Sequence, residues 1–298
     1  MDIGKKIKEL RLSKMMTQTE LAGHEITRNM LSRIENGAAL PSLGTVIYLA
    51  ERLGVPAGLL LAEDGDSFVF LKNKYLNNIK KAYIDENFGL CRDICKELLE
   101  LGHDDEAVLI MTEATYKLAE SELLSGRLYS CKSLLDDAII YAKQTIYNTD
   151  TVYYCSKALF YHIRHISPSL DSDNIECRNL AGLTKIISNC SKLCRYLNVM
   201  ESIEENRDES NELYSPDDNP SLYSQHIAAK LYMKKGMFEE ALKILNSIIN
   251  KEDIIPVFIM YLISADIEIC SKQTGDYKSA YEFATSRISL LEGMLSEV

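Results

Sequence analysis

A short segment near the start of the chain carries four polar side chains of the kind that read DNA bases: Arg28, Asn29, Ser32 and Arg33. Arginine can donate two hydrogen bonds to guanine, and asparagine can form a two-point contact with adenine. At helical spacing these residues share one side of a helix, and the other side is apolar: Met30, Leu31 and Ile34. We therefore expect the helix to bury its apolar side and present its polar side to the major groove. The alternative is that the two arginines are solvated surface charges.

The residues before and after this helix predict the elements that position it. Thr27 can cap its first turn, and Gly37 suits the left-handed position that ends a helix. Thr17 and Glu20 have the spacing of a capping box, which opens another helix. Gln18 then lies at a helix amino terminus, where backbone N–H groups attract an anion such as a DNA phosphate. Gln18 and Thr27 therefore join the predicted DNA-binding set.

Three further helices complete the predicted amino-terminal domain. Apolar residues recur at helical spacing over residues 3–14, which predicts the first helix. Pro41 and Ser42 start another helix, and Gly54 ends it. Residues 56–61 form a last short helix, so that five helices are expected.

Four motifs in this domain resemble the Xre, or phage-repressor, class of helix-turn-helix domains: TQTELA (17–22), LSRIENG (31–37), PSL (41–43) and LAERLGV (49–55). The resemblance covers residues 3–62. It implies a five-helix domain that holds a phosphate at Gln18 and faces the bases with three side chains: Arg28, Asn29 and Arg33. It also implies that Arg11 pairs with Glu35 in a structural role.

Charge divides the chain into two parts. The 298 residues carry a net charge of −11, yet residues 1–62 hold 8 Lys and Arg against 6 Asp and Glu. The remainder has 25 basic and 38 acidic residues, and an acidic surface does not attract phosphate. The polar run EDGDS lies between the two parts. We therefore expect a helix-turn-helix DNA-binding domain over residues 1–65 and a second domain over residues 66–298.

Four segments of the second part share one pattern, in which an apolar or aromatic residue precedes a small residue by three: the small residues are Cys91, Cys131, Ala241 and Ala280. The first two are 40 residues apart and the last two 39. Such a period is typical of helix pairs that stack into a solenoid. The segments KKGMFEEAL and QTGDYKSAY resemble tetratricopeptide repeats. We expect an all-α fold, with the five-helix domain followed by a tetratricopeptide-like helical-repeat solenoid.

A solenoid of helix pairs has a concave face that is lined by the first helix of each pair. Placing the repeat frame on the small residues predicts the side chains that bind a peptide there: Asn73, Lys80, Tyr83, Glu113, Tyr116, Glu120, Tyr223, His226, Lys230, Lys272 and Gln273. The alternative for each tyrosine is a half-buried position between helices. Residues 201–219 contain eight Asp or Glu, which predicts a solvated insertion between repeats or, alternatively, a docking segment for a basic partner.

The chain lacks the residue patterns of common enzyme and metal sites. It has no phosphate loop, no GxSxG and no HExxH. Its eight cysteines include two pairs spaced by four residues but no CxxC pair, so we interpret them as structural free thiols. His162 and His165 could share a helix face, as surface or groove residues. We expect no enzymatic activity, no cofactor and no bound metal.

The first ten residues are charged and lack the apolar core of a secretory signal. No apolar run approaches the roughly 20 residues that a membrane span needs. We therefore expect a cytoplasmic protein that does not bind a membrane.

An Xre-type head joined to a helical-repeat body resembles the peptide-responsive regulators of Gram-positive bacteria known as the Rgg/PlcR/PrgX group. The resemblance implies a homodimer joined through the repeat body. It implies a short signalling peptide in the concave groove that adjusts affinity for a double-stranded DNA operator, as in quorum sensing. One alternative makes the repeat body a docking platform for a partner protein. Another is an enzyme-like regulator that acts on a response regulator, which nothing in the sequence requires.

Overall fold

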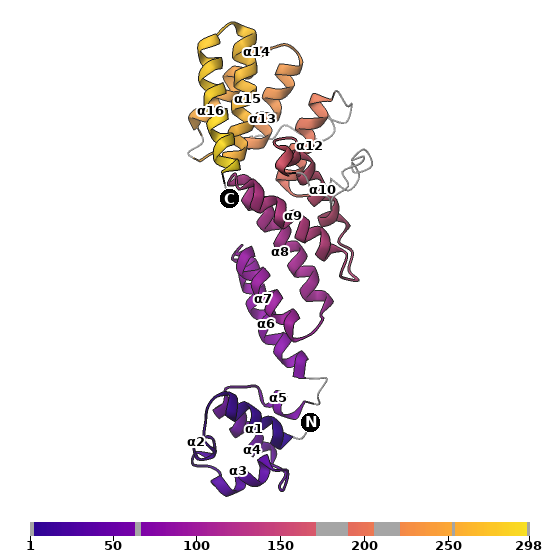
Figure 1. Ribbon diagram of the computed structural model, residues 1–298, viewed down its shortest axis with the longest axis vertical. Coiled ribbons are helices and arrows are strands. Elements are labelled where there is room, and N and C mark those ends of the chain that lie inside the picture. Colours follow the sequence, from indigo (N-terminus) through magenta and orange to yellow (C-terminus); the bar gives the residue numbers. More distant parts are fainter. Residues whose placement is uncertain (1–2, 63–66, 171–189, 206–220, 252–253, 297–298) are drawn as a thin grey trace. The chain divides into compact units, whose positions relative to one another are not determined.

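The computed structural model of the chain describes residues 3–62, 67–170, 190–205, 221–251 and 254–296 (Figure 1). Within these residues every regular element is a helix, and no strand occurs. The all-α fold expected from the sequence is therefore confirmed. None of the described helices is both long enough and apolar enough to cross a membrane.

The chain divides into two compact units. The amino-terminal unit comprises residues 1–85 and 97–103, and the repeat unit comprises residues 86–96 and 104–298. The domain boundary predicted between residues 65 and 66 lies outside the described residues.

The amino-terminal unit begins with five helices: α1 (Ile3–Ser13), α2 (Gln18–Ala22), α3 (Arg28–Glu35), α4 (Leu43–Leu53) and α5 (Ala57–Leu61). A sixth, α6 (Ser67–Ile84), follows. The first five share one core, whose members include Ile7, Leu21, Leu31, Ile34, Leu49 and Leu53. The five-helix prediction is confirmed, with one correction. Met30, predicted on the buried side of α3, is 37% exposed because it lies at the edge of that side, and Glu35 takes the buried place at the opposite edge.

The predicted helix ends are present. Thr17 accepts a hydrogen bond from the backbone of Glu20, and the Glu20 carboxylate accepts one from the Thr17 N–H at 2.7 Å, which completes the capping box. Thr27 caps α3 by accepting a backbone N–H of its first turn at 3.1 Å. Gly37 and Gly54 have left-handed φ values of +70° and +61°. These caps fix where each helix begins and ends, and therefore which side chains of α3 point outward.

The repeat unit is a succession of packed helices. After α7 (Phe88–Leu101), which both units share, they are α8 (Asp105–Leu124), α9 (Leu128–Ala142), α10 (Asp150–Arg164), the 3-10 turn η1 (Pro168–Leu170), α12 (Lys192–Glu204), α13 (Leu222–Lys234), α14 (Phe238–Lys251), α15 (Val257–Thr274) and α16 (Tyr277–Leu295). Three consecutive pairs pack as hairpins: α8 on α9, α13 on α14 and α15 on α16. Between them α10 contacts both α9 and α12, and α12 contacts α13. One hydrophobic core runs from α8 to α16.

The same turn precedes four of the helices. A residue with left-handed φ stands two positions before the first residue of α7, α9, α14 and α16: Glu86, Gly126, Gly236 and Gly275. Three residues after each helix start comes the small residue of the sequence pattern, at most 2% exposed in every case: Cys91, Cys131, Ala241 and Ala280. The pattern therefore marks a structural repeat, in which a small residue sits in the core behind a tight turn.

Two expectations about the repeat unit need correction. Glu201 and Glu204, predicted to open a solvated insertion, belong to the last turn of α12, and residues 206–219 lie outside the described residues. Cys155 and Cys190, predicted to be free thiols, form a disulfide with their Cα atoms 6.3 Å apart. The two cysteines are 35 residues apart in the sequence, and at that separation their spacing does not indicate that they pair.

Candidate nucleic-acid interface and ligand cavity

The outward side of α3 carries the predicted base-reading residues. Arg28, Asn29 and Arg33 are exposed, and Ser32 is half-buried. The opposite side of the same helix is fixed in the core by Leu31 and Ile34. The Thr27 hydroxyl is engaged in the helix cap. A helix that is anchored on one side and carries guanidinium and amide groups on the other has the form that enters a DNA major groove.

A buried ion pair holds α3 against the rest of the unit. Arg11 donates to both carboxylate oxygens of Glu35, at 2.6 and 3.0 Å, and to the backbone carbonyl of Met16 at 2.8 Å. Burial opposes ionisation of Glu35, but the hydrogen bonds from Arg11 and Gln18 outweigh it, and the pKa of this carboxyl lies below its usual value. The predicted pairing of Arg11 with Glu35 is confirmed.

Gln18 occupies the first position of α2, as its predicted phosphate contact requires. Its Nε2 donates to Glu35 at 2.8 Å, so the side chain is braced against the buried pair. The amino terminus of α2 therefore has a fixed position relative to α3. Contact of Gln18 with a phosphate stays a prediction.

Two residues that the sequence did not single out brace the other end of α2. Arg52 donates to the carbonyls of Glu20 and Leu21, and Tyr48 donates to the carbonyl of Ala22 at 3.0 Å. These carbonyls belong to the last turn of α2, where helix hydrogen bonding leaves acceptors open. Arg52 lies within the LAERLGV motif, which was the signal that could have identified it.

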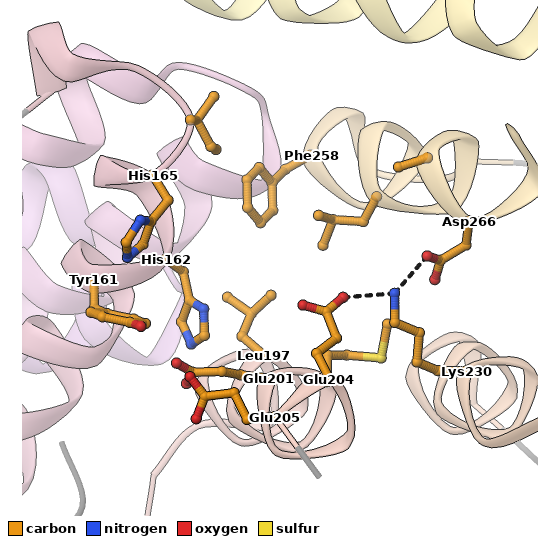
Figure 2. Close-up of a pocket in the computed structure, with 14 residues that line it drawn as sticks. Tyr161, His162, His165, Leu197, Glu201, Glu204, Glu205, Lys230, Phe258 and Asp266 are labelled. Atoms are coloured by element: carbon orange, nitrogen blue, oxygen red, sulfur yellow. Dashed lines mark hydrogen bonds and ion pairs between the residues drawn. The ribbon is translucent and has the colours of Figure 1, made fainter. Parts of the chain in front are cut away.

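The repeat unit contains a cavity of about 370 Å³ between four helices. Residues from α10, α12, α13 and α15 line it, together with His165 and Ile166 just after α10 and Glu205 just after α12 (Figure 2). The lining residues within the helices are Tyr161, His162, Leu197, Met200, Glu201, Glu204, Lys230, Phe258, Leu262, Ala265 and Asp266. The volume is within the range of about 300–1,000 Å³ that is typical of small-molecule sites. Its lining combines apolar side chains with converging charged groups.

An ammonium group held by two carboxylates closes one end of the cavity. Lys230 Nζ lies 2.6 Å from Asp266 and 2.7 Å from Glu204 (Figure 2). Burial alone would lower the pKa of Lys230, but the two carboxylates reverse that effect and raise it. Lys230 is therefore charged, and its charge is balanced within the protein.

A buried hydrogen-bond chain supports this end of the cavity from behind. His226 is fully buried, and its Nε2 donates to Asp266 at 3.0 Å. Its Nδ1 shares a hydrogen bond of 2.7 Å with the Tyr196 hydroxyl. These hydrogen bonds link α12, α13 and α15, and they give each of these buried polar groups a partner.

The other end of the cavity is aromatic. The rings of His162 and His165 both lie edge-on to Tyr161, with centroids 5.7 and 4.6 Å away. The shared face expected for the two histidines is therefore present. His162 Nε2 donates to Asn198 at 3.3 Å, and burial lowers the pKa of His162 to about 4.

Among the predicted groove residues, Lys230 lines this cavity. His226 and Tyr223 do not line it. His226 belongs to the buried series of hydrogen bonds, and Tyr223 stacks on Tyr196 with 4.7 Å between ring centroids. The glutamates at the end of α12 were not predicted as groove residues, because they begin the acidic run from residue 201, whose composition is typical of a solvated segment.

The remaining predicted groove residues lie elsewhere. Tyr116 and Glu120 on α8 are buried and share a 2.9 Å hydrogen bond, with Glu113 on the same helix. At the end of α15, Lys272 pairs with Glu268 at 2.6 Å and precedes Gln273. Three residues on α6 belong to the amino-terminal unit: Asn73, Lys80 and Tyr83. The eleven predicted residues are therefore not gathered in the cavity.

The disulfide lies near a third sulfur. The sulfur atoms of Cys155, Cys190 and Cys194 are within 4.8 Å of one another, and all three residues are buried. Burial raises the pKa of the Cys194 thiol to about 12, which leaves it protonated and a weak nucleophile. The free thiol is thus poorly suited to attack the neighbouring disulfide.

Comparison with known proteins gives one family match. Residues 7–60 match the family model described as helix-turn-helix. No curated protein matches the chain. Among solved structures the chain is similar to PlcR of Bacillus thuringiensis in complex with the peptide PapR7 and DNA, with 14% identity, 99% of each chain covered and a TM-score of 0.22.

Two further solved structures are similar over nearly the whole chain. One is ComR from S. thermophilus in complex with DNA and its signalling peptide ComS, with 15% identity, 97% of this chain and 99% of that chain covered, and a TM-score of 0.25. The other is a cysteine-to-serine variant of the Streptococcus dysgalactiae SHP pheromone receptor Rgg2, with 13% identity, 100% of both chains covered and a TM-score of 0.22. At these TM-scores the chains do not superpose closely.

The family match extends from the middle of α1 into α5 and so contains both braced helices and their caps. The local geometry agrees with it independently, because α2 is held by Arg52 and Tyr48 while α3 is held by Glu35 and presents a polar side outward. Residues 7–60 of this chain are therefore a helix-turn-helix DNA-binding domain.

Proposed function

We propose that this protein is a sequence-specific transcriptional regulator that reads a double-stranded DNA operator through α3. The observation that carries the proposal is the outward side of this helix, where Arg28, Asn29 and Arg33 are exposed within a helix-turn-helix domain. Gln18 and Thr27 complete the surface at two helix starts. Because the rest of the chain is acidic, attraction to phosphate is confined to this domain.

Fluorescence-anisotropy binding to the promoter fragment upstream of this gene tests the proposal. We expect Arg28→Ala/Arg33→Ala to weaken binding at fixed salt by about a hundredfold, since each bidentate base contact contributes roughly 1–3 kcal/mol. The control Lys235→Ala/Lys278→Ala removes two exposed positive charges from the repeat unit and should bind as wild type does. If both variants bind like wild type, the arginines are solvated surface charges.

The repeat unit is proposed to form a homodimer through α16. Tyr277, Tyr281 and Ile288 are 72%, 73% and 55% exposed and lie within about 40° of one another around the helix axis. Such an exposed apolar stripe along one helix suits a second copy of the same helix. The dimer would hold two copies of α3 roughly one DNA turn apart, about 34 Å.

Sedimentation analysis tests the dimer. We expect Tyr277→Glu/Tyr281→Glu to shift the protein to monomer, because two buried carboxylates would oppose association. Tyr147→Glu/Tyr232→Glu changes two exposed tyrosines outside α16 and should remain dimeric. A monomeric wild type would refute this part of the proposal.

The repeat unit is further proposed to sense a short signalling peptide at the four-helix cavity. A ligand there would touch α10, α12, α13 and α15 at once, so it could favour one packing of these helices over another. Through the dimer, that preference would change the spacing of the two α3 helices and hence operator affinity.

Operator binding with and without a short secreted peptide encoded beside this gene tests the sensing role. A peptide-dependent change in affinity is expected. Equal operator affinity in the presence of every such peptide would instead favour the alternative, in which the repeat unit docks a partner protein.

A further inference from the structure

We propose that reduction of the disulfide between Cys155 and Cys190 opens a three-sulfur site for trivalent arsenic, which these two cysteines form together with Cys194. The ligand class is a neutral oxyacid of a thiophilic metalloid, and arsenous acid is the probe. The three cysteines are not among the residues that line the four-helix cavity, so the inference is independent of the proposed peptide sensing. Four features support it: the convergence of the sulfur atoms, the start of α12, the number of ligands and the charge of the surroundings.

Three sulfur atoms from two helical segments converge in the core of the repeat unit. Cys155 belongs to α10, Cys190 directly precedes the N-cap of α12, and Cys194 lies in the first turn of that helix. Their sulfur atoms lie within 4.8 Å of one another, and all three residues are buried in one hydrophobic core. Sulfur binds a metal ion at about 2.3 Å, so two sulfurs on one ion are at most about 4.6 Å apart. Once the disulfide is open, rotation of these side chains can therefore place all three sulfurs around a single atom.

The start of α12 holds the third sulfur beside the disulfide. Ser191, the N-cap, accepts a hydrogen bond from the backbone N–H of Cys194 at 3.2 Å, which fixes the turn that follows Cys190. The side-chain amide of Asn198 donates to the Cys194 sulfur at 3.5 Å, and the Tyr116 hydroxyl is a second hydrogen-bond partner of this sulfur. Such partners orient a ligand before an ion binds.

The number of ligands selects the kind of ion. Among the residues that the structure describes, the cluster contains three potential ligands and no fourth. Structural zinc sites take four ligands in a tetrahedron. Trivalent arsenic instead forms three bonds to sulfur and keeps a lone pair, so three cysteines complete its coordination.

The charge of the surroundings favours a neutral complex. Glu120 is buried and acts electrostatically on Cys194, and its own charge is balanced by Lys117 at 3.2 Å. Three thiolates around Zn²⁺ or Cu⁺ would add a net negative charge beside this balanced pair, in a core where an uncompensated charge is costly. Three sulfurs around trivalent arsenic carry no net charge. The site therefore favours the metalloid over a soft metal cation.

The chemistry has two balanced steps. A phosphine and one water molecule reduce the disulfide to two thiols, and the phosphine leaves as its oxide; a dithiol does the same by becoming a disulfide. Arsenous acid, As(OH)₃, then exchanges its three hydroxyl groups for the three sulfurs, and each hydroxyl leaves as water with one thiol proton. Arsenic stays trivalent throughout. The product joins α10 to the start of α12 again, in place of the disulfide.

Native mass spectrometry and X-ray absorption of the full chain test the inference. The protein is reduced with a phosphine, separated from it and mixed with less than one equivalent of arsenite. We expect the chain to gain one arsenic atom and lose three hydrogens, and the arsenic to have three sulfur neighbours. Oxidised protein should lack the three-sulfur signal, a comparison that needs no variant. An equal amount of Zn²⁺ should leave the arsenic bound.

Two variants locate the site. Cys194→Ser should leave two sulfur neighbours around the arsenic and weaken binding by about a hundredfold, since a chelate loses one of its tethered ligands. Cys91→Ser/Cys95→Ser removes another two buried cysteines, four residues apart on α7, and should keep the three-sulfur signal. If Cys194→Ser does not fold, the comparison of reduced with oxidised wild type decides the question.

The contrary outcomes are distinct. Two sulfur neighbours in reduced wild type would refute the site, as would three that persist in Cys194→Ser or in the oxidised protein. Loss of the three-sulfur signal in Cys91→Ser/Cys95→Ser would place the arsenic at α7 instead. Displacement of the arsenic by Zn²⁺ would refute the preference for a metalloid. If reduced wild type binds no arsenic, the inference fails.

Discussion

The two units of this chain distribute charge in opposite ways. In the amino-terminal unit the carboxylate of Glu35 is buried against Arg11, while the guanidinium groups of α3 point to solvent. In the repeat unit Lys230 is held by two carboxylates, while Glu201 and Glu205 line a cavity. The amino-terminal unit thus buries an acidic group and exposes basic ones, whereas the repeat unit buries a basic group between two acidic ones.

The buried ion pairs of the two units also have different roles. Glu35 ties three elements of a small domain together, because Arg11 belongs to α1 and Gln18 to α2. The ion pair of Lys230 and Asp266 instead lies in the wall of a cavity, and the hydrogen bonds through His226 support Asp266 from behind. The first arrangement fixes a surface, and the second shapes a space that a ligand can enter.

The largest effect is expected from breaking the anchor of the amino-terminal unit. Glu35→Ala leaves the Arg11 guanidinium buried without its partner, so the free energy of unfolding of this unit should fall by about 3–5 kcal/mol. Operator binding should fall with it. Urea unfolding followed by circular dichroism measures the loss, with the exposed Glu51→Ala on α4 as the control. A loss of less than about 1 kcal/mol would show that Glu35 is not an anchor.

A pH effect of intermediate size is expected in the repeat unit. His162 has a folded-state pKa of about 4 against an ordinary value of 6.5, so between these pH values the unfolded chain binds the extra proton. Acidification from pH 6.5 to 4 should therefore reduce stability by up to about 3 kcal/mol, with no contribution from His162 above pH 7.

The isosteric change His162→Gln isolates this effect. The slope of unfolding free energy against pH between 6.5 and 4 should be shallower in the variant than in wild type. Equal slopes would mean that His162 is protonated in the folded protein, and the cavity would then hold an additional positive charge.

The smallest effect separates two glycines of the repeated turn. Gly126→Ala places a Cβ 2.8 Å from Val257 and 3.0 Å from Met294 in a left-handed conformation, while Gly236→Ala meets no atom within 4 Å. We expect a loss of about 2–3 kcal/mol for the first and about 1 kcal/mol for the second, since only the first adds overpacking to the cost of positive φ. Thermal unfolding of the two variants measures the difference. Equal losses would show that the turn of α8 and α9 does not pack tightly against α15 and α16.

The sequence predicted the helix-turn-helix domain in detail because its signals are local. The capping box at Thr17, the cap at Thr27 and the stop at Gly54 each act within one turn of a helix, so spacing alone identifies them. Met30 was misplaced because Glu35 is buried on the same short helix, through a partner 24 residues away. A polar residue that is buried by a distant partner has no local signature.

In the repeat unit the periodicity predicted the turns and the small core residues but not the cavity. The cavity needs four helices whose contributing residues run from Tyr161 to Asp266, and its acidic wall lies within a run that the sequence describes as solvated. The burial of His226 likewise depends on Asp266, 40 residues away. Such sites depend on how the helices pack against one another, and the period of the sequence repeat does not determine that packing.

The disulfide of Cys155 and Cys190 makes a closed covalent ring of the chain between α10 and α12. A protease that cuts once anywhere between these two cysteines opens the ring but does not divide the molecule. The two fragments would migrate together on a gel without reductant and separate only after reduction. The helices that line the cavity from either side of such a cut would therefore remain tethered to one another.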